Sequence, residues 1–175
     1  MPDDYEEALA VLRRAMHLLQ SWQLGIEDEA ALIAAYRDLA SRIDPRVLVA
    51  PMIKAQGVEM LLGMIHDDQF GPVVLLGFGG LHVEALADVV YALPPFDVAE
   101  ARRMVDRLRF APLLQSRRHR NALAVHEFCR TAAQFSSLVA GLGDLVSEMD
   151  LNPVIVHADS CVIVDALVVA KARKA

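Results

Sequence analysis

The chain has 175 residues, with 17 Lys and Arg against 23 Asp and Glu and a formal net charge of −6. An acidic chain repels the phosphate backbone of nucleic acids, which excludes nonspecific nucleic-acid binding as its role. Hydrophobic residues make up 55% of the sequence, yet no apolar run approaches the ~20 residues that span a bilayer. We therefore expect one globular domain with an added helical segment, no membrane insertion, and a buried interface between copies in a homo-oligomer.

The two cysteines and the N-terminal residues indicate the cellular compartment in which the protein is found. Cys129 and Cys161 show neither a C-x-x-C spacing nor the number of cysteines that a disulfide framework needs. The first residues, MPDDYEE, lack the basic start and apolar run of a signal peptide. A reducing, cytoplasmic location fits both observations.

The first part of the chain predicts two amphipathic helices. Residues 3–21 repeat apolar side chains at helical spacing after an acidic first turn, and residues 27–42 begin with acids and end with arginine. Gly25 separates the two patterns. We expect residues 1–26 to form an N-terminal helical extension and residues 27–175 to form the main domain.

The pattern then changes from helical to extended. Three short segments rich in branched apolar residues follow one another at 46–53, 58–66 and 72–78, with AQG and DDQFG in the two gaps. Such segments predict a meander of three adjacent strands.

Helical patterns return after the sequence GFGG. Residues 81–93 predict a helix that ends at a double proline, residues 97–109 predict a second helix with Asp97 as its N-cap, and residues 122–142 predict a long third helix. The chain closes with two short apolar runs, VIVH and CVIVDALVV, about a turn. Because strands and helices are segregated and the strands are mostly adjacent, we expect an α+β fold with a largely antiparallel sheet.

Two oxygen-bearing side chains, Asn152 and Asp165, interrupt this apolar C-terminal hairpin. If Val156 pairs with Cys161, the same antiparallel register sets Asn152 directly opposite Asp165, with Asp150 on the same face one step further along. Directly paired Cβ atoms lie about 4.5–5.5 Å apart, so an amide oxygen and a carboxylate could share Mg²⁺ with phosphate oxygens and water. The alternative is a turn opened by the Asn-Pro pair and a solvated edge carboxylate, and a slip of one residue in register would remove the pairing.

Four short motifs occur in a specific order along the chain. They are G-x-E at 57–59, D-x-x-F-G-P at 67–72, G-x-G-G-x-x-V-E at 77–84 and D-x-N-P at 150–153. Together, over about residues 28 to 170, they resemble the ATP-grasp domain of ADP-forming acyl-CoA synthetases, a group that includes acetyl-CoA synthetases and succinyl-CoA synthetase β-subunits. The resemblance is to the C-terminal ATP-grasp subdomain. It implies ATP and Mg²⁺ as cofactors and the ATP-dependent ligation of a carboxylate to CoA.

The resemblance implies a role for each residue that matches a family motif. Asn152 and Asp165 match the Mg²⁺ ligands of the family, in agreement with the hairpin register, and Asp150 matches the acidic partner of that asparagine. These three residues form the candidate metal site.

A second set of matching residues surrounds the glycine-rich turn near the reacting phosphate. Glycines allow the backbone to approach an anion, and a helix that begins after them offers N–H groups. The alternative is structural, since a tight strand-to-helix turn needs glycines and a strand can carry an exposed carboxylate. The matching residues are Gly77, Gly79, Gly80, Glu84 and, in the strand that begins with G-x-E, Glu59.

The sequence also departs from the family pattern. The family carries a phosphate-binding lysine in its first subdomain, whereas no lysine here precedes Lys54, and Ala50 replaces a polar residue of the hinge strand. Arg118 lies where the family has G-x-R-G-x-x-P-x-D, where it would offset developing charge, but the segment reads SRRHRNALA. The D-A-R of the family reads Asp165, Ala166, Leu167.

These departures leave two hypotheses. In the first, the chain is a component of an ADP-forming synthetase, inactive alone, and the missing half comes from another chain or is absent only from this sequence; a possible partner chain carries the CoA-binding and phosphohistidine-bearing domains. In the second, the chain is a non-catalytic ATP-grasp remnant that acts as a self-associating interaction or regulatory module.

Overall fold

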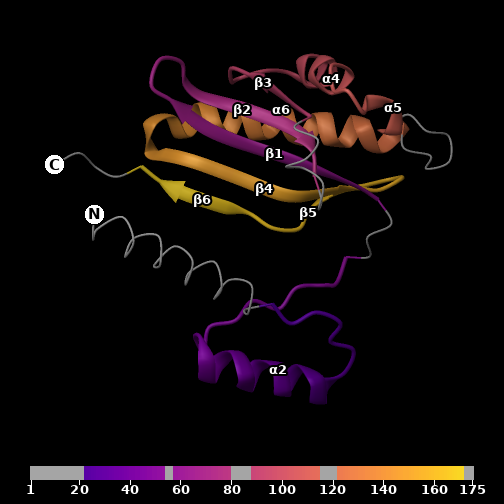
Figure 1. The fold of residues 1–175 in the computed structure, drawn as a ribbon, viewed down its shortest axis with the longest axis vertical. Coiled ribbons are helices and arrows are strands. Elements are labelled where there is room, and N and C mark those ends of the chain that lie inside the picture. The colour runs from indigo at the N-terminus through magenta and orange to yellow at the C-terminus, as the bar shows by residue number, and fades with distance from the viewer. Residues whose placement is uncertain (1–21, 54–56, 80–87, 115–121, 172–175) are drawn as a thin grey trace, which may run out of the picture. The chain divides into compact units, whose positions relative to one another are not determined.

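The computed structural model describes residues 22–53, 57–79, 88–114 and 122–171 (Figure 1). The chain divides into two compact units, residues 1–54 and residues 55–175. The helix predicted at 3–21, which makes up most of the proposed N-terminal extension, lies outside the described residues.

The first unit contains one helix among its described residues, α2 (Glu29–Arg42). Its N-cap is Asp28, whose carboxylate accepts a hydrogen bond from the backbone N–H of Ala31 at 2.8 Å. This confirms the helix predicted at 27–42. The helix buries no residue, so its packing contributes little to stability within the described part of this unit.

The strand predicted at 46–53 is wrong, because these residues are described without strand structure. Their composition favours an extended backbone, but a strand also needs a neighbour that takes up its backbone N–H and C=O groups. No described strand pairs with this segment, and Pro51 lacks an N–H.

The second unit is built on an antiparallel sheet with the order β3-β2-β1-β4-β5, in which β6 also pairs with β4. Every described pair of neighbours is antiparallel, which confirms the α+β prediction. The strands are β1 (Val58–Asp67), β2 (Gly71–Phe78), β3 (Val89–Ala92), β4 (Val146–Val156), β5 (Cys161–Ile163) and β6 (Leu167–Ala170).

Helices pack against one face of this sheet and enclose the core (Figure 1). They are α4 (Val98–Asp106), α5 (Ala111–Leu114) and α6 (Ala122–Leu142), and the 3-10 turn η1 (Gly143–Leu145) leads from α6 into β4. On β1 the alternate residues Met60, Leu62 and Met64 are fully buried against these helices. Alternation along a strand therefore turns Glu59 and Gly63 to the opposite face.

Two of the predicted helices form, although α4 ends at Asp106, three residues before its predicted end at 109. The Asp97 side chain accepts a hydrogen bond from the N–H of Glu100 at 2.8 Å, which confirms it as the N-cap of α4. The long helix α6 begins and ends where its periodicity predicted.

The helix predicted at 81–93 is wrong at its C-terminal end. Val89–Ala92 form β3, an edge strand paired with β2. The branched and aromatic side chains of this segment, VVYA, favour a strand once a free sheet edge is beside them. Residues 81–87 lie outside the described residues.

The C-terminal hairpin has the predicted register. Val156 pairs with Cys161, and Val154 pairs with Ile163. After an interruption the same register resumes with Asp150 opposite Leu167. β5 and β6 therefore lie one after the other along the same edge of β4.

Candidate metal and phosphate site

The candidate metal site lies on the sheet face that points away from the helices. Met149 and Leu151 of β4 are buried in the core, so the side chain of Asp150 between them points to the opposite face. Asp150 is half-buried, whereas Asn152 and Asp165 are exposed. The site thus combines one partly desolvated carboxylate with two oxygen-bearing groups that solvent can reach.

The pKa of Asp150 responds to both Asn152 and Asp165, so the three side chains lie near one another. Burial is the largest influence on the pKa of the Asp150 carboxyl and raises it. A hydrogen bond with the Asn152 side chain acts in the opposite direction, while the charges of Glu148 and Asp165 raise this pKa further. A carboxylate that is crowded by like charges and partly desolvated favours a proton or a metal ion.

The gap in the strand ladder places Asn152 opposite Asp165. Both flanking stretches of the hairpin have the same register, and within the gap Val164 donates its N–H to the carbonyl of Pro153 at 3.0 Å. The Asp165 carboxylate accepts the N–H of Ala166 through Oδ1 at 2.8 Å. The backbone therefore holds one oxygen of Asp165 in a defined orientation.

The side-chain oxygens of Asp150, Asn152 and Asp165 can fill only part of the coordination shell of a hard cation such as Mg²⁺. The described residues include no group of three or more His, Cys, Asp or Glu side chains that could hold a metal ion. Two carboxylates and one amide leave several positions of a Mg²⁺ octahedron to other oxygens, and phosphate and water commonly fill such positions. This arrangement suits a metal that arrives with a nucleotide more than a permanently bound ion.

The predicted phosphate-turn residues meet at the adjoining ends of β1 and β2. The carbonyl of Glu59 accepts the N–H of Gly79 at 2.7 Å. A Cβ at Gly77 would lie 2.5 Å from the carbonyl oxygen of Asp88, and one at Gly79 would lie 3.1 Å from backbone atoms of Met60. Close backbone packing thus accounts for both glycines, and their contact with phosphate stays a prediction.

Three of the sequence-predicted site residues, Gly80, Glu84 and Arg118, lie outside the described residues. The glycine-rich turn is therefore described only up to Gly79, and the basic stretch around Arg118 has no described contacts.

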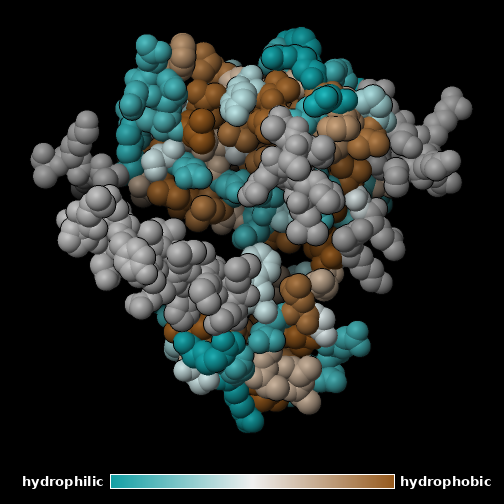
Figure 2. Space-filling view, viewed as in Figure 1, coloured by the Kyte–Doolittle hydropathy of each residue, from teal (hydrophilic) through white to brown (hydrophobic). Residues whose placement is uncertain are grey.

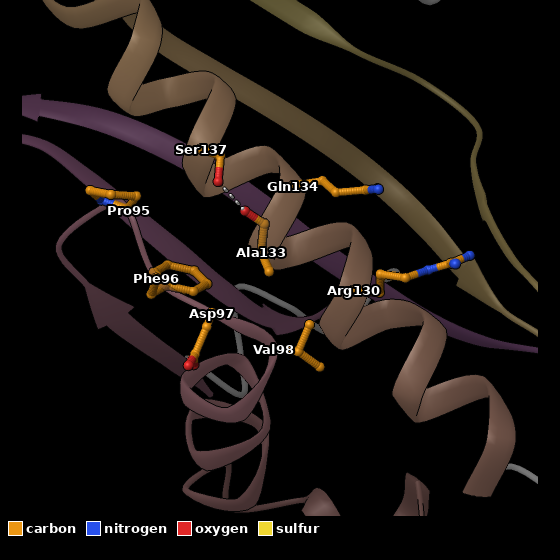
Figure 3. Close-up of a pocket in the computed structure, with 8 residues that line it drawn as sticks. All are labelled: Pro95, Phe96, Asp97, Val98, Arg130, Ala133, Gln134 and Ser137. Atoms are coloured by element: carbon orange, nitrogen blue, oxygen red, sulfur yellow. Dashed lines mark hydrogen bonds between the residues drawn. The ribbon is translucent and has the colours of Figure 1, made fainter.

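The sequence did not predict a groove of about 650 Å³ on the helical side of the second unit (Figure 3). It lies between α6 and the segment that joins β3 to α4, and in Figure 3 the side chain of Ser137 bonds back to the carbonyl of Ala133 at 3.1 Å. Its walls are mainly apolar in area, with Asp97, Arg130, Gln134 and Ser137 as polar members. The sequence offers one indication of this groove, the four-residue spacing that puts Arg130 and Gln134 on the same side of α6. Because α6 packs on the other face of the sheet, this groove is separate from the candidate metal site.

A small polar cluster was also missed. His66 at the end of β1 approaches Asp144 of η1, with Nε2 3.2 Å from Oδ1, and the same oxygen lies 3.3 Å from Nζ of Lys171. These three residues are far apart in the sequence and show no motif. They join the end of β1 to η1 and to the segment after β6.

Comparison with known proteins identifies the fold. A model of the ATP-grasp domain family matches residues 18–170. The chain belongs to the ATP-grasp family.

The relatives of this ATP-grasp chain are acyl-CoA synthetases. The β subunit of acetate–CoA ligase (ADP-forming) II from Pyrococcus furiosus is 36% identical over 127 residues, which cover 71% of this chain and 53% of the relative. The β subunit of acetate–CoA ligase (ADP-forming) I from the same organism is 33% identical over 110 residues, which cover 63% and 47%. The ATP-grasp chain thus spans about half the length of these curated relatives.

Solved structures agree with this relationship. PH1788 from Pyrococcus horikoshii Ot3 superposes with a TM-score of 0.73 and 31% identity, over 88% of this chain and 68% of that one. Acetyl-coenzyme A synthetase 1 of Ca. Korarchaeum cryptofilum, in complex with coenzyme A and Mg-AMPPCP, superposes with a TM-score of 0.68 and 26% identity, over 85% and 67%. The resemblance to ADP-forming acyl-CoA synthetases is therefore confirmed at the level of homology and fold.

Proposed function

We propose that the chain is a component of an ADP-forming acyl-CoA synthetase and that the candidate metal site binds Mg²⁺ together with the phosphates of ATP. The observation that carries the proposal is the strand register that sets Asn152 opposite Asp165 beside Asp150, whose pKa both residues influence. Homology to synthetase β subunits supports the reaction class, in which ATP drives the joining of a carboxylate to CoA.

Each residue of the site has a distinct task in this proposal. When bound, Mg²⁺ would neutralise charge on the phosphoryl group that is transferred. The amide oxygen of Asn152 and the carboxylate of Asp165 would be its protein ligands. Asp150 would act through Asn152, whose amide lowers the pKa of the Asp150 carboxyl: by accepting a hydrogen bond from the amide NH₂, Asp150 would leave the amide oxygen free for the metal.

The cation that would hold the β- and γ-phosphates is not among the residues assigned to the site. The first lysine of the sequence is Lys54, and the described residues 22–53 contain one helix and no strand. We propose that this cation is supplied from outside this sequence, by a second chain or by another part of a longer protein. A partner that carries the CoA-binding and phosphohistidine-bearing functions would complete the enzyme, which we place in the cytoplasm.

One observation favours the alternative of a non-catalytic module. No described residue of the first unit is buried, although large apolar side chains such as Trp22, Leu24 and Leu48 lie within it. Apolar side chains of both units reach the surface in Figure 2. A surface of this kind suits a protein whose role is to bind another chain.

Calorimetric titration of the full chain with Mg·ATP distinguishes the two functions. For a synthetase component we expect weak binding, with a Kd of about 1 mM, because only part of the site is present. Asp165→Asn should abolish this binding by removing a charged metal ligand. Asp159→Asn is the matched control, since Asp159 is an exposed acid in the turn of the same hairpin.

Each result of the titration has one meaning. Absence of heat for the wild type at ~10 mM nucleotide would favour the non-catalytic module. Equal loss in both variants would contradict the assignment of Asp165. A Kd near 1 μM for the wild type would show that no second chain is needed.

A further inference from the structure

The edge of the sheet formed by β6 is open and apolar. No described strand pairs with its outer side. All residues of β6 are exposed, and the two most exposed are Leu167 at 54% and Val168 at 55%. An unpaired apolar edge of this kind is a template for pairing with another strand, and proteins usually cover it or interrupt it.

The opposite edge of the same sheet is limited by prolines. Pro94 and Pro95 lie two and three residues after the last residue of β3, and proline cannot donate a hydrogen bond to an added strand. β6 contains neither proline nor a charged residue. The two edges therefore differ in their capacity to accept a strand.

The backbone of β6 presents regularly spaced free groups on its outer side. Lys171 donates its N–H to the carbonyl of Leu145, and the carbonyl of Val169 accepts the hydroxyl of Ser147, so both residues direct these groups toward β4. Backbone groups alternate in direction along a strand. The N–H and C=O groups of Val168 and Ala170 accordingly point outward.

The sequence of β6 and its flanking residues allows favourable antiparallel pairing with a second copy of itself. It reads Asp-Ala-Leu-Val-Val-Ala-Lys from 165 to 171. If two copies run antiparallel about a two-fold axis at Val168, that residue meets its own copy through its outward N–H and C=O groups. Alanine then lies opposite alanine, Leu167 lies opposite Val169, and Asp165 lies opposite Lys171 of the second copy, once on each side of the axis.

The opposite charges at the two ends of this segment favour a second copy of the same chain as the partner strand, and they favour the register centred on Val168. Asp165 is exposed, and the Lys171 side chain is 38% exposed beside Asp144, so both termini of the segment are accessible. Opposite charges that face each other across antiparallel strands are favourable, and like charges are unfavourable.

The geometry points to a homodimer in which β6 of one copy pairs antiparallel with β6 of a second copy, centred on Val168, to join the two sheets. This strand pairing is a mode of association that uses backbone hydrogen bonds for affinity and side-chain pairs for register. The inference does not rest on the proposed synthetase activity, but it shares Asp165 with the proposed metal site, so the Val168 and Tyr91 variants test it without altering that site.

Sedimentation of the full chain over a concentration series tests the dimer. The contact is small, so we expect a monomer–dimer equilibrium with a dissociation constant of about 10–100 μM. Val168→Lys places two like charges at the two-fold axis and should raise this constant at least about tenfold. Tyr91→Lys is the matched control on the other edge strand, where Tyr91 is also 55% exposed, and it should leave the constant unchanged.

A charge exchange tests the register. Asp165→Lys alone should weaken the dimer because it faces Lys171 of the second copy. Asp165→Lys combined with Lys171→Asp should restore it, which a merely structural effect of either change would not do.

The proposal is overturned by any of three results. These are a wild-type chain that stays monomeric to ~500 μM, a dimer that withstands Val168→Lys or dissociates only with Tyr91→Lys, and a charge exchange that fails to restore association. Circular dichroism of every variant checks that the sheet is intact, and Val168→Thr, which keeps the branched shape without charge, should remain dimeric.

Discussion

At the scale of single residues, Asp150 is held where its charged form is disfavoured. Burial raises the pKa of its carboxyl, and the charges of Glu148 and Asp165 add to the effect. A carboxyl whose pKa is higher in the folded protein than in the unfolded chain lowers the stability as the pH rises through the interval between the two values. The folded protein therefore holds this proton more tightly than the unfolded chain does.

Asp150→Asn replaces the titrating carboxyl with an amide that carries no charge at any pH of the experiment. We expect the variant to unfold at a higher temperature than the wild type at pH 7 without metal, because the desolvated charge is gone. The difference should disappear near pH 3, where the wild-type carboxyl is protonated in both states. Thermal unfolding at the two pH values measures this, and a variant less stable than the wild type at pH 7 would contradict the assigned environment.

Also at the scale of single residues, the backbone around Gly77 leaves no room for a side chain. A Cβ at this position would lie 2.5 Å from the carbonyl oxygen of Asp88. Gly77→Ala should therefore destabilise the protein by about 1–3 kcal/mol, as is usual when a backbone must move to relieve overpacking. Gly141 in α6 is the control, since nothing lies within 4 Å of a Cβ there. Gly141→Ala should be neutral or stabilise by up to ~1 kcal/mol.

Urea unfolding of both glycine variants measures these changes in the free energy of unfolding. Equal effects at the two positions would contradict the close approach of β2 to Asp88. Loss of stability in Gly77→Ala would also explain this glycine without any contact to phosphate.

At the scale of elements, one buried hydroxyl connects α6 to the segment that precedes α4. Ser136 is fully buried, accepts the N–H of Phe96 at 3.1 Å and can donate to the carbonyl of Ala133 at 2.8 Å. Ser136→Ala leaves the Phe96 N–H without its partner, which should cost about 1–3 kcal/mol.

Ser137→Ala is the matched control one residue further along the helix. Ser137 bonds only to the carbonyl of Ala133 in its own helix among the described contacts. Its loss should change the free energy of unfolding by less than about 0.5 kcal/mol. Equal effects of the two substitutions in chemical denaturation would show that the bond to Phe96 does not connect the elements.

Periodicity predicted the elements that carry their own signals. The long helix α6 has an uninterrupted 3.6-residue pattern, and α4 has an N-cap at Asp97. The hairpin register followed from the turn between Val156 and Cys161. The segments at 46–53 and 89–92 have similar branched, apolar compositions, yet only the second is a strand. Their difference is the presence of a partner strand, and a local pattern does not contain that information.

The candidate site was predictable to a similar degree. Strand pairing alone placed Asn152 opposite Asp165, and the structure adds that both residues influence the pKa of Asp150. The burial of Asp150 depends on how the sheet packs, so the sequence could not predict the direction of its pKa shift. The groove beside Arg130 combines two elements distant in sequence, and no motif marks it.

At the scale of the whole molecule, the two units differ in what they bury. The second unit has a continuous apolar core between sheet and helices. None of the described residues of the first unit is fully buried. Large apolar side chains are exposed in the described parts of both units. None of the described helices is long and apolar enough to cross a membrane.

The central claim is that Asp150, Asn152 and Asp165 form a site for a metal and a nucleotide phosphate. The most direct test is paramagnetic broadening of the backbone amide resonances of the full chain by Mn²⁺ with ATP, with Mg²⁺ and ATP as the reference. Broadening should centre on these three residues and should be lost in Asp165→Asn. The amides of Asp67 at the end of β1 and of Asp68 in the turn that follows should be broadened less than those of the site. Broadening centred on that turn, or none near Asn152, would contradict the account.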